Sequence, residues 1–146
     1  MIEKLRKDLE QDEGVKYELY LDHLLLLTGG IGHLITEGEP EYNYPVGTPV
    51  SKERVDSWFQ VDIKNCLEDC QNIFMNWEEL PEEAQCILSN MAFNLGGPRL
   101  SKFQNMIDAV QREDFDSAAN EMHNSRWRRQ VPQRASRLIE RMRALA

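Results

Sequence analysis

Residues 12–34 read DEGVKYELYLDHLLLLTGGIGHL, and this stretch predicts how the rest of the chain is arranged. Apolar and polar residues alternate from Val15 to Asp22, which indicates a β-strand. The glycine-rich segment GGIGH follows after a short connection, so the two segments are expected to form a hairpin. The sequence therefore places two carboxylates, Glu13 and Asp22, and the hydroxyl of Thr28 on one hairpin.

The two acids of this hairpin are expected to lie in different environments. A first helix is indicated over residues 2–11, because apolar residues recur at spacings of three and four at Ile2, Leu5 and Leu9. Gly14 can cap this helix, which leaves Glu13 at the negative end of the helix dipole and favours it as a proton donor. Asp22 lies on the polar face of the strand and is expected to be ionised. Such a pair is typical of general acid/base hydrolysis, but spacing alone favours the alternative of two surface acids without a catalytic role.

A long helix is expected over residues 51–75, beginning at Ser51. Its apolar residues step by three and four at Val55, Trp58, Phe59, Ile63, Cys66, Leu67, Cys70, Ile73 and Phe74. Asp62 lies within this apolar stripe, and a carboxylate on a buried face needs a partner. We predict an ion pair between Asp62 and His33, which would raise the pKa of His33.

The rest of the chain is expected to be helical. Pro81, Asp114, Ser125 and Pro132 begin separate helices, and a further helix is expected over the apolar positions between 100 and 110. The predicted fold class is therefore α+β in a single domain. It comprises a small N-terminal lobe over 12–50 with the hairpin and an irregular loop, a connecting helix over 51–75, and a C-terminal helical lobe over 81–146. The helix at 1–11 is expected to pack on the helical lobe.

Composition limits the possible classes of protein. The chain has 146 residues, enough for one domain with a core. No apolar run approaches the roughly 20 residues that span a bilayer, and the first residues lack the apolar segment of a signal peptide. We therefore expect no insertion into a membrane and a location in the cytoplasm of the cell that makes the protein.

Two further features suggest binding sites but have simpler explanations. Cys66 and Cys70 are one helical turn apart, yet no His or Cys cluster lies nearby, so they are expected to be buried apolar residues and no metal or cofactor is predicted. Arginines are concentrated after residue 124, at 126, 128, 129, 134, 137, 141 and 143, against the single acid Glu140. They could attract an anionic wall or nucleic acid. A solvated helix face is favoured, and no nucleic-acid partner is expected because no nucleic-acid-binding module is present.

Several segments together resemble the T-even bacteriophage lysozymes, glycoside hydrolase family 24. In the hairpin they are EG at 13–14, YLD at 20–22 and TGGIGH at 28–33. In the second half they are NMAFNLG at 90–96, SRW at 125–127 and QVPQRA at 130–135. The resemblance covers nearly the whole chain and is looser over 36–52 and 64–86. Leucines at 24–27 in the turn, where the family usually has polar residues and a glycine, and Gly29, where a larger side chain is common, depart from the pattern.

The resemblance implies a muramidase that cleaves the β-1,4 bond between N-acetylmuramic acid and N-acetylglucosamine in peptidoglycan and so lyses bacteria. Glu13 would protonate the leaving oxygen, while Asp22 and Thr28 would activate water on the opposite face of the sugar. This inverting arrangement needs carboxyl groups about 6.5–9.5 Å apart, whereas a retaining pair lies at about 5–5.5 Å.

The resemblance also implies supporting roles and a cleft between the lobes. Leu34 and Phe93 would line the cleft, and Arg134 would hold Glu13 in place. Taken alone, Phe93 would be interpreted as a core aromatic residue and Arg134 as a solvated charge. The family also has a His–Asp pair at the positions of His33 and Asp62.

Two other function classes remain open from the sequence. One is a catalytically weak module that keeps the lysozyme fold and binds the cell wall, and the other is a nucleic-acid binder with a basic C-terminal segment. Intact Glu13, Asp22 and Thr28 favour the enzyme. We expect a monomer that reaches the wall after release from the host cytoplasm.

Overall fold

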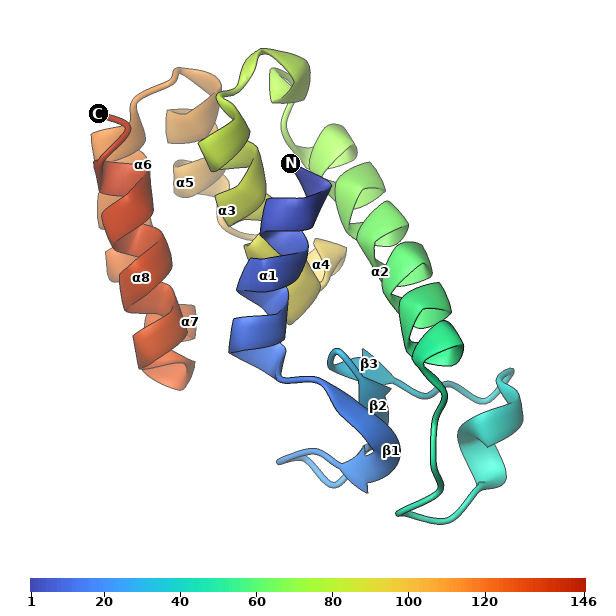
Figure 1. Cartoon of the computed structure of the whole chain (residues 1–146). Helices are drawn as coiled ribbons and strands as arrows, with labels where there is room; N and C mark the ends of the chain where they lie inside the picture. The colour runs from blue at the N-terminus through green and yellow to red at the C-terminus, as the bar shows by residue number, and fades with distance from the viewer. The chain divides into compact units, whose positions relative to one another are not determined.

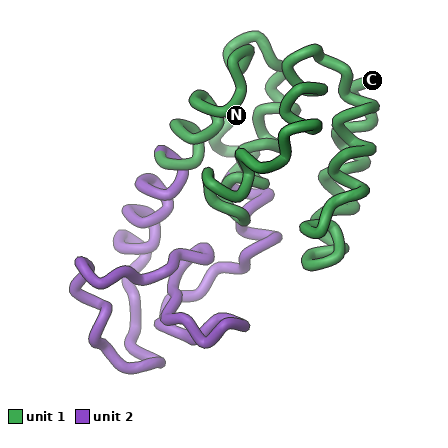
Figure 2. The backbone as a smooth tube through the Cα atoms, turned by 180° about the vertical axis from the view of Figure 1, so that it is seen from behind, with its two compact units in different colours: residues 1–5, 65–146 green, residues 6–64 purple.

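The computed structural model describes residues 1–146, and the chain divides into two compact units (Figure 2). One unit comprises residues 6–64, and the other comprises residues 1–5 and 65–146. Two helices, α1 (Ile2–Glu13) and α2 (Lys52–Ile73), have residues in both units. The fold class is α+β, as predicted from the sequence.

The unit of residues 6–64 contains a small antiparallel sheet (Figure 1). Its strands are β1 (Lys16–Leu21), β2 (Leu27–Gly30) and β3 (His33–Leu34), in that order across the sheet. In the register, Tyr20 lies opposite Thr28, and Thr28 lies opposite Leu34. The sheet therefore brings together residues from both arms of the hairpin and the following strand.

The expected alternation of buried and exposed residues along the first strand is wrong in detail. Leu19 is buried, but Tyr17 and Leu21 are 50% and 46% exposed although both were placed on the apolar face. The register between β1 and β2 shifts between Lys16 and Tyr20, and such an irregularity breaks a period of two. Ile2, expected on the inner face of α1, is also exposed.

The segment that leads from the sheet to α2 is mostly irregular, as expected. It holds one short 3₁₀ helix, η1 (Pro40–Asn43), and a single bridge between Glu18 and Pro49. Helix α2 then begins where the Ser51 hydroxyl accepts a hydrogen bond from the backbone N–H of Arg54, at 3.1 Å. This side-chain cap satisfies one of the free N–H groups of the first turn.

The second unit is helical. After the C-terminal part of α2 it contains η2 (Trp77–Glu79), α3 (Glu82–Leu95), α4 (Gly97–Leu100), α5 (Gln104–Gln111), α6 (Phe115–His123), α7 (Arg126–Gln130) and α8 (Pro132–Arg143). Helix α3 contributes much of the core, with Ile87, Leu88 and Met91 fully buried. Helices α6 and α8 pack against each other, and α5 packs on α6 (Figure 1).

The single helix predicted across positions 100–110 is wrong, because the chain forms two helices there. Helix α4 ends at Leu100 and α5 begins at Gln104. Phe103 between them has a non-helical backbone with φ −78° and ψ 58°. Gly97 and Pro98 begin α4, because proline fits the first turn of a helix.

The expected starts of α6 and α7 are confirmed. Asp114 accepts a hydrogen bond from the N–H of Ser117, and Ser125 accepts one from the N–H of Arg128. The three cysteines, Cys66, Cys70 and Cys86, are buried free thiols, and burial raises the pKa of Cys70 to about 12. They behave as apolar core residues, as the sequence indicated.

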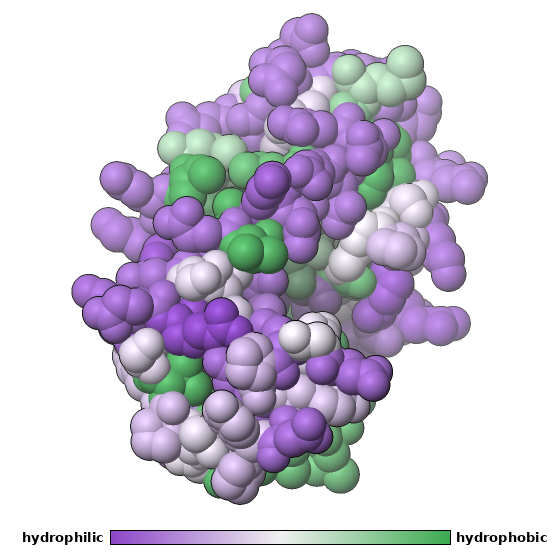
Figure 3. All heavy atoms as spheres, turned by 90° about the vertical axis from the view of Figure 1, so that its right-hand side faces the viewer, coloured by the Kyte–Doolittle hydropathy of each residue, from purple (hydrophilic) through white to green (hydrophobic).

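The face of the molecule in Figure 3 is largely hydrophilic. In the view of Figure 3, apolar residues form small separate patches among charged and polar side chains. The longest helix, α2, carries charged residues along its length, and no helix combines the length and the apolar character that crossing a membrane requires.

Candidate active site

Glu13 is the last residue of α1, and two glycines determine its surroundings. Gly14 ends the helix with φ +77°, a conformation that favours glycine. Gly32 has φ +59°, and a Cβ atom added there would lie 2.6 Å from Oε1 of Glu13. The Glu13 carboxyl group therefore packs directly against the backbone of Gly32, where no larger residue fits.

Asp22 follows β1 and organises the hairpin turn. Its Oδ1 atom accepts hydrogen bonds from the backbone N–H groups of Leu24 and Leu26, at 2.8 and 2.9 Å. The N–H of Leu25 donates to the main-chain oxygen of Asp22 at 2.9 Å. The carboxylate is thereby held in one orientation, and its Oδ2 atom has no partner in the protein.

Thr28, at the start of β2, is 4% exposed. Its hydroxyl donates a hydrogen bond to the carbonyl oxygen of Leu26 at 2.8 Å. The backbone of Leu26 thus joins Asp22 and Thr28, since its N–H binds one and its C=O binds the other. Because the only hydroxyl proton of Thr28 is engaged in this hydrogen bond, the Thr28 oxygen can only accept a hydrogen bond from any further group.

Tyr20 lies beside both acids, a role that the sequence analysis missed. Burial raises the pKa of Tyr20, and the negative charges of Glu13 and then Asp22 raise it further. Both carboxylates therefore lie within electrostatic reach of one phenol. The Lys16 ammonium group stands 4.5 Å from the centre of the Tyr20 ring. The only signal in the sequence was the place of Tyr20 in the YLD segment.

The predicted contact between His33 and Asp62 is confirmed, with 2.7 Å between Nδ1 and Oδ2. The second ring nitrogen, Nε2, lies 2.8 Å from Oε1 of Glu39, a partner that the sequence did not indicate. Burial is the largest influence on the pKa of His33 and lowers it. The hydrogen bonds and charges of Asp62 and Glu39 together outweigh burial and raise the pKa. Because each nitrogen faces a carboxylate, the geometry favours the doubly protonated ring.

Trp58 of α2 packs against both β2 and β3, at Gly29 and His33. Its ring stacks on His33 with centroids 4.7 Å apart and planes inclined by 14°. A Cβ atom at Gly29 would lie 3.0 Å from the Trp58 ring, which accounts for glycine where the family commonly has a larger residue. The Arg54 guanidinium group also lies over the Trp58 ring, 5.0 Å from the ring centroid. The Nε and Nη2 atoms of Arg54 donate hydrogen bonds to the Glu41 carboxylate at 2.7 and 2.9 Å.

The remaining predicted residues are differently placed. Leu34 is on β3 and 46% exposed. Phe93 and Arg134 belong to the helical unit. The expected place of Phe93 in the cleft and the expected contact of Arg134 with Glu13 both stay predictions. Phe93 is partly buried against the helical core.

Arg134 is not the solvated charge that its sequence context alone would suggest. It is 7% exposed, and its Nε atom donates to the side-chain oxygen of the fully buried Asn90 at 2.9 Å. In the same unit, the indole N–H of Trp127 donates to Asn94 at 2.7 Å. The family-like segments of the second half therefore contribute buried polar contacts to the helical core.

Comparisons with known proteins give one consistent result. The phage lysozyme family model matches residues 10–144. The "Probable T4-type lysozyme 2" of Dictyostelium discoideum is 30% identical, over 95% of this chain and 93% of that protein. The "Peptidoglycan hydrolase gp36" of Pseudomonas phage phiKMV is 29% identical, and the "Pre-baseplate central spike protein Gp5" of Enterobacteria phage T4 is 27% identical. These matches cover 94% and 89% of this chain but only 15% and 26% of those longer proteins.

The α+β fold and a hairpin with two carboxylates and a buried hydroxyl define a glycosidase of the lysozyme type. Together with the match over residues 10–144, they lead to one conclusion: the chain belongs to the phage lysozyme family. Peptidoglycan is accordingly its substrate.

Proposed function

We propose that this chain is an inverting muramidase in which Glu13 is the general acid and Asp22, with Thr28, activates the attacking water. The substrate bond is the β-1,4 link between N-acetylmuramic acid and N-acetylglucosamine. The observation that carries the proposal is a pair of hydrogen bonds at the Leu26 backbone. Its N–H donates to the Asp22 carboxylate and its C=O accepts from the Thr28 hydroxyl, which fixes the two side chains next to each other.

The hydrogen bonds of Asp22 and Thr28 suit them to orient one water molecule. Because the Thr28 proton is donated to Leu26, its oxygen can accept one proton of the water. Oδ2 of Asp22, which has no protein partner, can accept the other. A water held by two acceptors directs its own lone pair away from them and toward an electrophilic carbon. As the water oxygen forms its bond to the anomeric carbon of the sugar, Asp22 takes up a proton from that water.

Glu13 completes the reaction as proton donor. Its carboxyl lies against Gly32, on the segment that joins β2 to β3. As the glycosidic bond breaks, the Glu13 proton moves to the leaving oxygen, and the water oxygen becomes the new hydroxyl on the anomeric carbon with inverted configuration. The raised pKa of Tyr20 keeps its side chain a neutral phenol at neutral pH. A neutral phenol adds no negative charge beside the two acids and so does not hinder either proton transfer.

The product of purified peptidoglycan digestion tests this proposal. A muramidase leaves N-acetylmuramic acid at the new reducing end, which borohydride reduction followed by hydrolysis identifies. Proton NMR at early time points should give the α-anomer first. Reducing N-acetylglucosamine would contradict the bond assignment, and the β-anomer would contradict inversion.

The same experiment separates the other function classes. A wall-binding module without catalysis would sediment with the peptidoglycan but release no reducing ends. A nucleic-acid binder would be retained on DNA, with retention falling steeply as salt increases. We expect neither of these two outcomes. Retention on DNA in particular should be weak, because an acidic chain with net charge −8 has little attraction for phosphate.

We also propose that the enzyme is monomeric and acts on the wall after release from the cytoplasm of the cell that produces it. Size-exclusion chromatography with light scattering should give a mass near 17.0 kDa. Fractionation of producing cells before lysis should find the protein with the cytoplasmic marker, and its recovery with membranes would contradict the proposal.

A further inference from the structure

Tyr20 occupies a place in the hairpin that the proposed mechanism does not use. The sheet register puts Tyr20 directly opposite Thr28, and Thr28 directly opposite Leu34. Residues that are directly opposite in an antiparallel sheet share a face, so these three side chains form one row across the three strands. Thr28 is buried in the middle of the row, between the half-buried Tyr20 and the exposed Leu34. Tyr20 is therefore the neighbour of the hydroxyl that orients the attacking water.

Two charges locate the phenol of Tyr20 more closely. The negative charges of Glu13 and Asp22 both raise the pKa of Tyr20, and Glu13 has the larger effect of the two. In an inverting site the two carboxyl groups stand about 6.5–9.5 Å apart, with the reacting sugar and the water between them. A phenol that both carboxylates influence therefore lies beside the gap that the reacting sugar occupies.

The hydroxyl group of Tyr20 is free to bind that sugar. It forms no hydrogen bond within the protein, and its oxygen is not among the enclosed polar atoms. Its raised pKa keeps the proton in place at neutral pH, so the hydroxyl can donate a hydrogen bond there. The Thr28 proton, by contrast, is already donated to Leu26. Of these two neighbouring hydroxyl groups, only that of Tyr20 offers a proton to the substrate.

Lys16 holds the ring of Tyr20 in place. It begins β1, four positions before Tyr20, and its ammonium group lies 4.5 Å from the centre of the ring. The register shift between these two residues bends the strand locally, which suits this contact. Lys16 forms no ion pair in the structure, so its charge acts on the ring through the attraction of a cation to an aromatic face.

We propose that Tyr20 contacts the substrate, and that its hydroxyl donates a hydrogen bond to an oxygen of the sugar whose anomeric carbon is attacked. The inference rests on the proposed function, because it takes Glu13 and Asp22 to be the acid and the base. The proton of Tyr20 stays on the phenol, and no covalent bond to Tyr20 forms. The hydrogen bond holds the sugar between the two carboxyl groups, with its anomeric carbon facing the water. Tyr20 is thus a catalytic residue, and Lys16 is a positioning residue.

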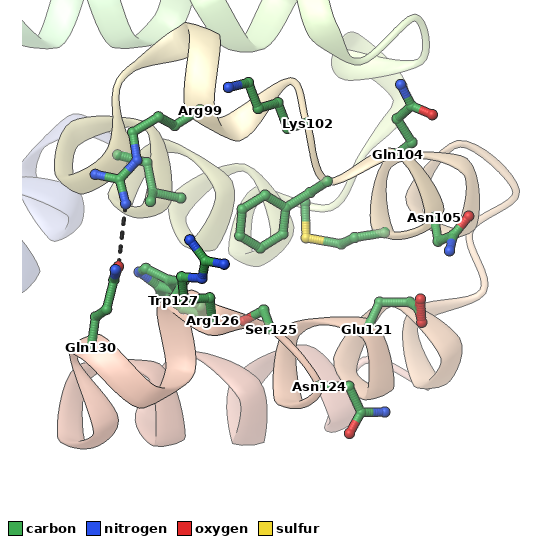
Figure 4. Close-up of a pocket in the computed structure, with 13 residues that line it drawn as sticks. Arg99, Lys102, Gln104, Asn105, Glu121, Asn124, Ser125, Arg126, Trp127 and Gln130 are labelled. Atoms are coloured by element: carbon green, nitrogen blue, oxygen red, sulfur yellow. Dashed lines mark hydrogen bonds between the residues drawn. The ribbon is translucent and has the colours of Figure 1, made fainter.

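A pocket of about 480 Å³ in the helical unit provides an internal reference for variants of the hairpin (Figure 4). Its lining comes from residues between 95 and 130, including Trp127, and no residue of the hairpin lines it. Substitutions at Tyr20 and Lys16 should therefore leave this pocket unchanged. The NMR resonance of the Trp127 indole N–H, which donates to Asn94, reports on that.

Tyr20→Phe removes the hydroxyl group and keeps the ring beside Lys16. The substrate is soluble, uncrosslinked peptidoglycan glycan, and the release of reducing ends gives the rate. We expect kcat to fall about 3–10-fold with KM nearly unchanged, the effect of one neutral hydrogen bond that is strongest in the transition state. Tyr17→Phe removes a 50% exposed tyrosine hydroxyl from the same strand and should match the parent in both constants.

Substitutions of Lys16 test the positioning role. Lys16→Met removes the cation and should lower kcat about 2–5-fold, as expected for one cation–π contact. Lys16→Arg keeps a cation over the ring and should restore most of the parent rate. Lys52→Met removes an exposed lysine in the same unit and should leave kcat unchanged. A loss of rate in Lys16→Met that Lys16→Arg does not restore would refute the positioning role.

A pH profile separates substrate contact from a structural role. A fluorinated tyrosine introduced at position 20 alone keeps the ring and the hydroxyl group, but its phenol ionises at a lower pH. A phenolate cannot donate a hydrogen bond, so activity should fall about 3–10-fold in step with the phenolate absorbance. The groups that face this phenol are Glu13, Asp22 and Lys16. The same residue at position 17 should leave the pH profile of the parent unchanged.

The outcomes separate this inference from the proposed function. A parent that releases no reducing ends would refute the enzyme assignment before any variant is compared. An active parent that Tyr20→Phe equals in kcat, or a fluorinated protein whose activity does not change as the phenolate forms, would overturn the inference. The fluorinated protein differs little from the parent in shape, so it stays decisive if Tyr20→Phe does not fold.

Discussion

Replacing Asp62 by Asn removes one of two carboxylates that hold the His33 ring. His33 is 11% exposed at its side chain, and Asp62 is 23% exposed, so their 2.7 Å contact is only partly screened by water. Asn keeps the shape and can still accept a hydrogen bond from Nδ1–H. The substitution therefore tests the charge of the pair with little change in packing.

The expected cost follows from the kind of bond that is lost. A hydrogen bond to a charged group contributes about 1.5–3 kcal/mol, and a neutral one about 0.5–1.5 kcal/mol. The difference predicts a loss of about 1–2 kcal/mol when His33 is protonated. For a chain of this size that corresponds to a fall of roughly 3–7 °C in the melting temperature.

The effect must depend on pH in a fixed direction. The pKa of His33 is raised above 6.5 in the folded protein, so its contribution is complete below the unfolded pKa and is lost as pH rises through the folded value. Above that value the neutral ring has one N–H for two carboxylates, and a lone pair then faces Asp62 or Glu39. The difference between the parent and Asp62→Asn should therefore be largest near pH 5.5 and fall to about 0.5 kcal/mol or less near pH 9.

Thermal unfolding followed by circular dichroism from pH 5.5 to pH 9 measures this difference. Glu37→Gln removes an exposed carboxylate from the loop that also holds Glu39, and this variant serves as the control. NMR titration of the His33 ring should give a higher midpoint in the parent than in Asp62→Asn. A difference that is constant with pH, or one that grows toward pH 9, would refute the reasoning.

Three further substitutions probe the hairpin. Gly29→Ala should cost about 1–2 kcal/mol in chemical denaturation, because its Cβ would lie 3.0 Å from the Trp58 ring; unchanged stability would mean that Trp58 moves freely. Gly32→Ala should lower lytic activity at least about tenfold as well as stability, because it displaces the Glu13 carboxyl from its position; full activity would contradict that contact. Leu25→Gly should raise stability by about 0.5 kcal/mol, because Leu25 is 76% exposed and has φ +63°; a destabilised variant would show that the leucine side chain contributes in the folded state.

Local signals in the sequence predicted the features that depend on nearby residues. The caps at Ser51, Asp114 and Ser125 follow from short-range hydrogen bonds, and each is present. The contact of Asp62 with His33 was predictable because a carboxylate in an apolar stripe needs a partner.

Features that depend on distant packing were not predictable. Glu39 lies in an irregular loop with no periodicity, so nothing indicated that it would bind the second nitrogen of His33. Gly29 looked like a departure from the family until the Trp58 ring was found to fill the space. The burial of Arg134 likewise depends on Asn90, which is 44 positions away in the sequence.

The most direct test of the account is the lysis rate of the Glu13→Gln variant. Permeabilised bacterial cells would be incubated with the parent and the variant, and the fall in turbidity recorded, with melting temperatures measured in parallel. The account predicts that lysis falls by about 10²–10⁴-fold while the melting temperature stays within a few degrees, because Gln keeps the shape of Glu13 but has no acidic proton to donate. A folded variant that lyses cells at the parent's rate would contradict it.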